Sequence, residues 1–139
     1  MSDQTVLLVE DNSNDVDLTL LAFKEVEFTH QVVVARDGTE ALDYLFGRGK
    51  FASRDKANTP VLVLLDLKMP KIGGIEVLRK MRADPLLKKI IVVVLTSSNE
   101  EREKTEALEL GTNLYFRKAL DFDGSVATAR QIATLIPSR

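Results

Sequence analysis

The stretch Val6–Leu18, VLLVEDNSNDVDL, passes from four consecutive apolar residues straight to two adjacent acids, Glu10 and Asp11. A short apolar run without alternation is typical of a strand that is covered on both faces, as in a parallel sheet. Two neighbouring carboxylates at the end of such a strand repel each other and lose hydration. A compensating positive charge must therefore come from elsewhere in the chain.

Four further apolar runs follow the first one along the chain. The runs are TVLLV from Thr5, QVVVA from Gln31, VLVLL from Val61, IIVVVL from Ile90 and a shorter NLYF from Asn113. The segments between them have helical spacing, such as Val16, Leu20 and Phe23, and two of them begin with capping boxes, Asp37 with Glu40 and Ser98 with Glu101. This alternation predicts an α/β doubly wound fold with a five-stranded parallel sheet and five helices.

Length and composition narrow the classes of protein to consider. The chain has 139 residues, 45% of them apolar, a formal net charge of −2 and no cysteine. We expect one domain over residues 1–139, and no disulfide or thiolate metal site. The charge gives no case for nucleic acid, and no signal peptide or membrane span is visible. These features predict a cytoplasmic protein with no nucleic-acid or membrane partner.

Polar residues follow four of the predicted strands. They are Glu10 and Asp11, Asp66, Thr96 and Lys118. In an open parallel sheet, ligands bind beyond the carboxyl ends of the strands, so these side chains should meet at one edge. Three clustered carboxylates suit Mg²⁺, which prefers oxygen ligands and often pairs carboxylates with phosphate. Asp66 could then attack phosphorus, while Lys118 and Thr96 bind phosphoryl oxygens.

Each of these residues has a simpler explanation when it is taken alone. Acids after a strand often cap the next helix, and Asn12 or Asp15 could do so here. A threonine can reflect β-propensity, and a lysine can be surface charge. The basic connection Gly47–Pro60, GRGKFASRDKANTP, fits either a solvated excursion or a docking loop. The combination at successive strand ends is what favours a phosphate-handling site.

Four segments together resemble the receiver domain of two-component response regulators. They are VLLVEDN from Val6, LLDLKMPKIGG from Leu64, VVVLTSS from Val92 and YFRKA from Tyr115, with Gly74 eight residues after Asp66. The resemblance covers nearly the whole chain and implies the flavodoxin-like strand order 2-1-3-4-5. The long loop and RDG at Arg36 also resemble single-domain regulators that partner phytochrome-type kinases.

The resemblance implies a role for each site residue. Asp66 would be the phosphoacceptor, and Glu10 and Asp11 would bind Mg²⁺ together with Asp66 and the backbone carbonyl of Lys68. Lys118 would bind the phosphoryl group, and Thr96 with Tyr115 would form the switch pair. The phosphoryl group would come from a sensor histidine kinase. One departure is Ala119, because the family usually has a cis proline after this lysine; we expect a trans bond here.

Two other functions compete with a phosphorylatable relay. A Mg²⁺-dependent phosphohydrolase would need an acid two residues after its nucleophile, where this chain has Lys68. A degenerate receiver that only binds partners is disfavoured by the intact site residues. We therefore expect a stand-alone phosphoacceptor with no output domain, which assists its own phosphorylation and dephosphorylation but is not a turnover enzyme.

A homodimer is a further expectation. The fourth helix, predicted over residues 99–110, is polar nearly all round, and the fifth helix carries a wide apolar sector. Phe122, Ile132 and Leu135 would form a dimer face together with the fourth helix and the fifth strand. A wide sector can equally reflect deep packing in the monomer.

Overall fold

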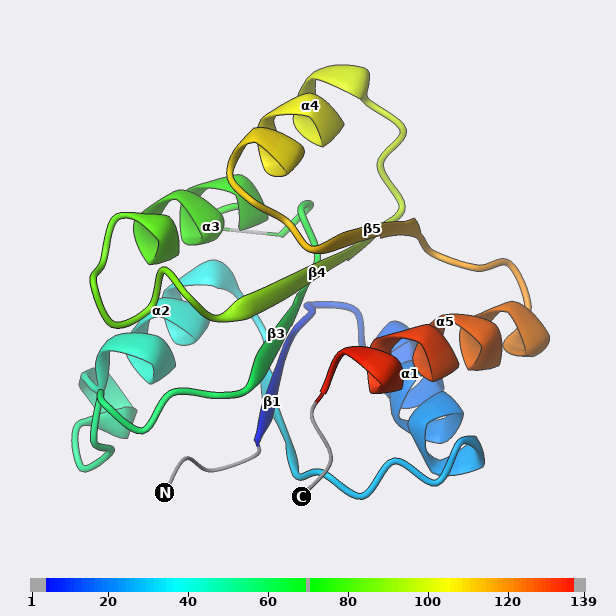
Figure 1. Cartoon of the computed structure of the whole chain (residues 1–139), viewed down its shortest axis with the longest axis horizontal. Coiled ribbons are helices and arrows are strands. Elements are labelled where there is room, and N and C mark those ends of the chain that lie inside the picture. The colour runs from blue at the N-terminus through cyan, green and yellow to red at the C-terminus, as the bar shows by residue number, and fades with distance from the viewer. Residues whose placement is uncertain (1–4, 70, 137–139) are drawn as a thin grey trace.

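The computed structural model describes residues 5–69 and 71–136. Within them, one parallel sheet has the order β2-β1-β3-β4-β5, as predicted (Figure 1). Its strands are β1 (Val6–Val9), β2 (Val32–Ala35), β3 (Leu62–Leu65), β4 (Ile91–Thr96) and β5 (Leu114–Arg117). The helices are α1 (Ser13–Glu25), α2 (Gly38–Phe46), α3 (Gly74–Arg82), α4 (Glu101–Glu109) and α5 (Phe122–Leu135), and a short 3₁₀ helix η1 (Gly49–Phe51) follows α2. None of these helices is both long and apolar enough to cross a bilayer.

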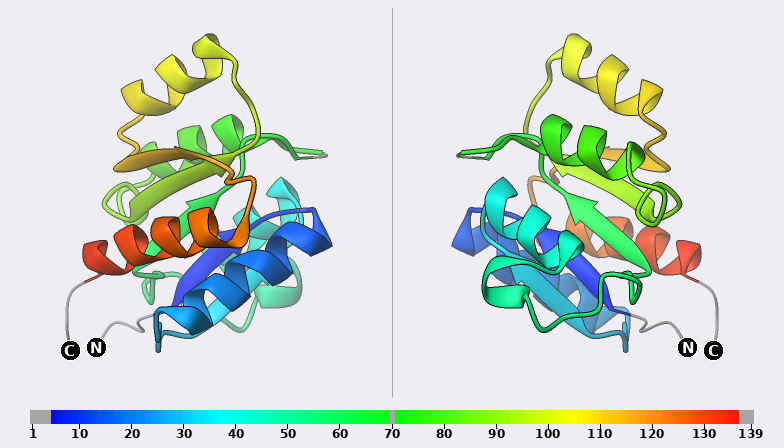
Figure 2. Two further views of the ribbon diagram at one scale, coloured as in Figure 1. Left: turned by 90° about the vertical axis from the view of Figure 1, so that its right-hand side faces the viewer. Right: turned by 90° about the vertical axis from the view of Figure 1, so that its left-hand side faces the viewer.

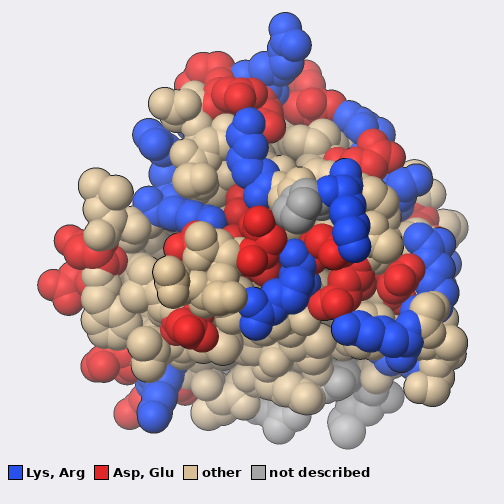
Figure 3. Space-filling view, turned by 180° about the vertical axis from the view of Figure 1, so that it is seen from behind, with Lys and Arg blue, Asp and Glu red and all other residues tan. Residues whose placement is uncertain are grey.

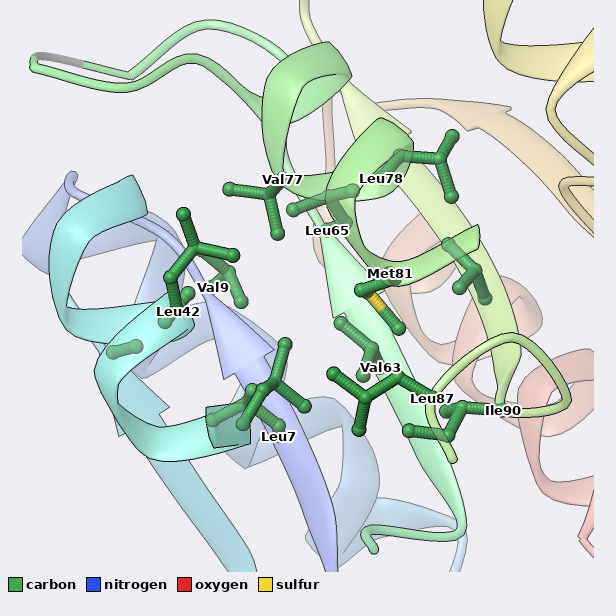
Figure 4. Packing of buried hydrophobic residues seen from close by; sticks show 14 of the residues in the cluster. Leu7, Val9, Leu42, Val63, Leu65, Val77, Leu78, Met81, Leu87 and Ile90 are labelled. Atoms are coloured by element: carbon green, nitrogen blue, oxygen red, sulfur yellow. The ribbon is translucent and has the colours of Figure 1, made fainter. Parts of the chain in front are cut away.

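The sheet separates two hydrophobic cores. Side chains alternate along each strand, so Leu7 and Val63 pack toward α2 and α3 (Figure 4), whereas Leu8 and Leu64 pack toward α1 and α5. Figure 2 shows the two helical layers from opposite sides of the sheet. Both faces of β1 and β3 are therefore covered, which explains why these strands are continuously apolar.

Helix α1 is rotated relative to the predicted stripe. Val16 and Phe23 are buried as expected, but Leu20 is 37% exposed and Ala22 is buried instead. The reason is that α1 packs against α5 as well as against the sheet. Two neighbours on different sides of the helix select a different set of inward positions from a single apolar stripe.

The predicted dimer face needs correction at α5. Ile132 is only 1% exposed and belongs to the core between α1, α5 and the sheet, and Leu135 is partly buried against the same core. Phe122 does lie at the surface, with 40% of its area exposed. The wide apolar sector of α5 is thus largely used within the monomer, because the helix contacts both the sheet and α1.

The two predicted capping boxes have different outcomes. Asp37 caps α2, since its Oδ1 accepts a hydrogen bond from the backbone N–H of Glu40 at 2.7 Å. Ser98 does not cap α4, which begins only at Glu101. The Ser98 hydroxyl instead donates to Glu103 Oε1 at 2.6 Å. The loop after β4 is therefore tied to α4 by a side chain of the helix itself.

The long basic connection packs on α2 and on the turn after α3. Arg48 pairs with Asp43 at 3.1 Å, Lys50 with Glu40 at 2.8 Å and Lys56 with Asp84 at 2.7 Å. Arg54 donates to the backbone carbonyls of Tyr44 and Asn58, and the ring of Phe51 meets that of Tyr44 edge-on. These basic side chains already have partners within the chain, which favours a structural excursion over a docking loop.

Candidate functional site

Three carboxylates meet at the carboxyl edge of the sheet. Val9 lies opposite Leu65 in the β1–β3 register, so Glu10 and Asp66 follow the two strands at neighbouring positions. Oxygen atoms of Glu10, Asp11 and Asp66 all lie within 4.8 Å of one another. Glu10 and Asp66 are each only 3% exposed, whereas Asp11 is exposed. The cluster therefore opens to solvent on the Asp11 side.

Lys118 supplies a positive charge that compensates the acids of the cluster. Its Nζ lies 2.9 Å from Glu10 Oε1, 2.6 Å from Asp15 Oδ2 and 3.1 Å from Asp66 Oδ2. Burial alone would lower the pKa of Lys118, but its hydrogen bonds to Asp15 and Glu10 outweigh burial and raise that pKa above its usual value. The Lys118–Ala119 bond is trans, as expected. The ammonium reaches Asp66 without the proline that the family usually carries.

Asp15 is the site residue that sequence reasoning missed. The sequence suggests for it only the role of a helix cap, but Asn12 caps α1 by accepting the Asp15 N–H at 3.0 Å. The Asp15 side chain is left to bind Lys118. One signal could have revealed it: Asp15 lies in the first turn of the helix that starts directly after the acid pair, so it projects near the same sheet edge.

The loop after β3 orients Asp66. The backbone N–H of Lys68 donates to Asp66 Oδ1 at 3.1 Å, and the N–H of Gly74 donates to the Leu67 carbonyl at 3.1 Å. A Cβ on Gly74 would lie 2.3 Å from the carbonyl oxygen of Asp66. This close approach explains why the position eight residues after Asp66 is a glycine. Any larger residue there would push α3 away from the site.

The acid cluster has the chemistry of a divalent-cation site. Burial raises the pKa of Glu10 to about 7, although its hydrogen bond to Lys118 acts in the opposite direction and the nearby Asp66 charge adds to the rise. The hydrogen bond from Lys118 alone therefore does not offset the cost of keeping Glu10 ionised. Hard oxygen ligands that converge at one edge fit a cation of the magnesium or manganese type.

Thr96 connects the site to α4, and Tyr115 lies further away. Thr96 is fully buried at the end of β4, and its Oγ1 accepts the Ser98 N–H at 3.1 Å. Ser98 in turn contacts Glu103 of α4. Tyr115 is half-buried in β5, where the Lys104 ammonium lies 5.6 Å from its ring centre. Burial, assisted by the charges of Glu103 and Glu101, raises the pKa of Tyr115.

The model of the response regulator receiver domain matches residues 6–130. The chain belongs to this family. It is 37% identical over 124 residues to the response regulator Rcp1 of Synechocystis, an alignment that covers 86% of this chain and 82% of Rcp1. Family membership makes the chain a receiver module of two-component signalling, in which such domains take up phosphoryl groups.

Solved structures of similar regulators agree with this assignment. The phosphorylated cyanobacterial phytochrome response regulator RcpA is 35% identical, with a TM-score of 0.87 and coverage of 99% of this chain and 100% of RcpA. The bacteriophytochrome response regulator AtBRR is 42% identical, with a TM-score of 0.81 and coverage of 100% and 98%. The Mn²⁺-bound form of Rcp1 has a TM-score of 0.86 at 32% identity and covers 97% of this chain and 99% of that one.

Positive and negative side chains are interspersed on the face opposite to the one seen in Figure 1. Over that face, the described Lys and Arg side chains alternate with Asp and Glu side chains (Figure 3). Elsewhere in the described chain, exposed ion pairs such as Arg79–Glu76 at 2.7 Å and Lys71–Asp37 at 3.3 Å also bring opposite charges together. Opposite charges this close largely cancel at a distance, so long-range attraction for one sign of ligand is weak over this face.

Proposed function

We propose that Asp66 accepts a phosphoryl group from the phosphohistidine of a sensor histidine kinase. The observation that carries the proposal is the setting of the Asp66 carboxylate. One of its oxygens accepts from the backbone of Lys68 and the other from Lys118, both at 3.1 Å, and Glu10 and Asp11 lie beside it. The carboxylate is buried and oriented, and it faces an acid pair that can hold a cation.

The chemistry is a phosphoryl transfer. A bond forms between an Asp66 oxygen and phosphorus, the bond between phosphorus and the donor nitrogen breaks, and the imidazole of the donor leaves. Lys118 binds a phosphoryl oxygen as the negatively charged phosphoryl group bonds to Asp66. Mg²⁺ would be held by Glu10, Asp11, Asp66 and the Lys68 carbonyl, and would neutralise phosphoryl charge. The protein accepts one group per molecule and assists its removal, and does not turn over a substrate.

Phosphorylation would act on α4 through Thr96. A phosphoryl oxygen on Asp66 is a strong acceptor for the Thr96 hydroxyl. Movement of Thr96 would break its contact with the Ser98 N–H, and Ser98 is linked to Glu103 at 2.6 Å. The loop and the start of α4 would follow, and Tyr115 would turn into the vacated space. The face formed by α4, β5 and α5 is then the surface that partners read.

The resemblance to phytochrome response regulators suggests the class of kinase. RcpA and AtBRR are described as phytochrome and bacteriophytochrome regulators, and this chain covers almost all of each. We therefore assign it a phytochrome-type histidine kinase as donor and a role as a relay in the cytoplasm.

A second copy of the chain is the proposed reader. Ile132 is buried and Leu135 is partly buried, so the large apolar side chains exposed on α4 and α5 in the described chain are Leu108 at 49% and Phe122 at 40%. Strand β5 lies at an edge of the sheet between these helices. A two-fold axis would place each apolar residue against the same face of the partner.

The deciding experiment is incubation with acetyl phosphate and Mg²⁺, followed by intact mass. Wild type should gain one phosphoryl group, and Asp66→Asn should gain none. Thr96→Ala should still be phosphorylated but should respond less in partner binding. No mass gain in wild type, or an equal gain in Asp66→Asn, would overturn the assignment of Asp66. A phytochrome-type kinase should phosphorylate wild type faster than an unrelated histidine kinase does.

A further inference from the structure

Three carboxylates share the Lys118 ammonium. The nearest of them is that of Asp15, a residue to which the family resemblance assigns no role. An ammonium has three N–H donors. Here it lies 2.6 Å from Asp15, 2.9 Å from Glu10 and 3.1 Å from Asp66. Glu10 and Asp66 also belong to the acid cluster, whereas Asp15 is outside it.

Asp15 is held in place by the fold. Its backbone N–H is bonded to the cap residue Asn12, and its side chain is about a third exposed. Asp15 and Lys118 stand together at the wall of a small cavity between α1 and α5, of about 40 Å³, whose other walls include Phe23, Leu95 and Ile132. The pair therefore links α1 to the end of β5 beside the phosphoacceptor.

A bound cation changes the balance among the three carboxylates. A divalent ion in the cluster competes with Lys118 for Glu10 and Asp66 and repels the ammonium at short range. The backbone of Lys118 is fixed by its bond to the Thr96 carbonyl at 2.8 Å, but that bond does not restrain the long side chain. Asp15 is the carboxylate partner that the ion does not engage.

We propose that Asp15 is a positioning residue, which holds the Lys118 ammonium beside Asp66 while the cation occupies the acid cluster. The proposal rests on the proposed phosphoacceptor function. Asp15 touches neither phosphorus nor the cation, and its whole effect passes through Lys118. Its neighbour Asp17 has the same charge on the same helix and is exposed, which makes it a matched control.

The test is a double-mutant cycle on the phosphorylation rate, measured by intact mass with acetyl phosphate at saturating Mg²⁺. Asp15→Asn should slow phosphorylation by about tenfold, the worth of one charge-assisted hydrogen bond. In a Lys118→Gln background the same change should have no further effect, since there is no ammonium left to position. Asp17→Asn should stay close to wild type, and Asp15→Glu should recover part of the rate.

Calorimetric titration with Mg²⁺ gives a readout apart from phosphorylation. In the Lys118→Gln background, Asp15→Asn should leave Mg²⁺ affinity unchanged, because no ammonium remains to compete with the ion for Glu10 and Asp66. Much weaker Mg²⁺ binding on Asp15→Asn in that background would make Asp15 a member of the metal set and overturn the proposal. An equal loss of rate with and without Lys118, or no loss at all, would also overturn it. If wild type gains no phosphoryl group, the phosphoacceptor function itself fails, which is a distinguishable outcome.

Discussion

The environment of Glu10 is unfavourable to its charge. Burial raises its pKa from the ordinary value of 4.5 to about 7. Between these two values the folded protein binds more protons than the unfolded chain, so the free energy of unfolding should fall as pH rises. The loss from this one group is roughly 3 kcal/mol at most. Asp37 and Asp84 have pKa values below their usual 3.8. Their contributions to stability are therefore lost only as the pH falls below that value.

The first prediction tests this carboxylate. Without metal, urea unfolding of wild type should show decreasing stability from about pH 5 to pH 7, and Glu10→Gln should flatten that decrease. Mg²⁺ binding should strengthen over the same range, because the cation selects the ionised acid. Parallel stability profiles for wild type and Glu10→Gln would show that Glu10 titrates at its ordinary value.

Gly74 allows a second test at the residue scale. A Cβ there would lie 2.3 Å from the Asp66 carbonyl oxygen, whereas on Gly73 its nearest contact would be 3.5 Å from the Leu67 carbonyl oxygen. Gly74→Ala should therefore cost roughly 2–4 kcal/mol of stability by forcing α3 outward. Gly73→Ala, at the N-cap of α3, should cost at most about 1 kcal/mol. Urea midpoints compare the two, and equal costs would mean that the close approach is not rigid.

Helix α4 is expected to be the least stable of the elements that cover the sheet. Ala107 is its one buried residue in the described chain, and no side chain caps its N-terminus. Helix α5 buries Ala129 and Ile132 and is capped by Asp121, which accepts the Gly124 N–H at 2.8 Å. Little burial and a missing cap both lower the free energy of local opening.

The third prediction follows for hydrogen exchange. Amides of α4 should exchange faster than those of α5 in the unphosphorylated protein, and α4 protection should change when Asp66 is phosphorylated. The Asp66→Asn variant under the same conditions is the control. Equal protection in both helices, unchanged by phosphorylation, would remove α4 from the output surface.

Arg82 joins three segments at the amino-terminal edge of the sheet, opposite to the edge that carries the site. Its guanidinium donates to the carbonyls of Leu110 and Gly111 after α4, and to those of Lys88 and Ile90 before β4. The C-terminal end of α4 is thereby fixed, so we expect any response to phosphorylation at its N-terminal end, where Lys68 and Ser98 contact Glu103.

The fourth prediction compares two arginines of α3. Arg82→Lys should lower stability by about 2 kcal/mol, since an ammonium cannot span the carbonyls that the planar fork reaches. Arg79→Lys should cost less than about 1 kcal/mol, because Arg79 makes exposed pairs with Glu76 and Glu106. Similar urea midpoints for the two variants would contradict the clamp.

At the scale of the whole molecule, the fifth prediction concerns self-association. Leu108→Glu and Phe122→Glu should each split a phosphorylation-dependent dimer, because both side chains are exposed on the α4 and α5 face. Leu21→Glu is the matched control, since Leu21 is 56% exposed on α1, outside that face. Sedimentation velocity with and without phosphodonor measures the effect. A wild-type chain that stays monomeric at high micromolar concentration in both states excludes the dimer.

The sequence by itself determined the strands, their order of alternation with helices, and the edge where Glu10, Asp11, Asp66, Thr96 and Lys118 collect. These features are local. A strand buried on both faces must be apolar along its whole length, and the first polar residue after it must lie at the sheet edge. Gly74 was also visible in the sequence, although its close contact with the Asp66 backbone was not.

Only the tertiary structure decided which side of each helix faces inward and which polar groups pair. Ile132 is buried, and not at the predicted surface, because α5 packs on α1 as well as on the sheet. Leu20 is exposed for the same reason. Asp15 and Lys118 are far apart in sequence, and nothing local requires them to meet. Their contact exists because α1 starts two residues after the acid pair and β5 ends at the same edge of the sheet. Such pairings depend on how whole elements pack together.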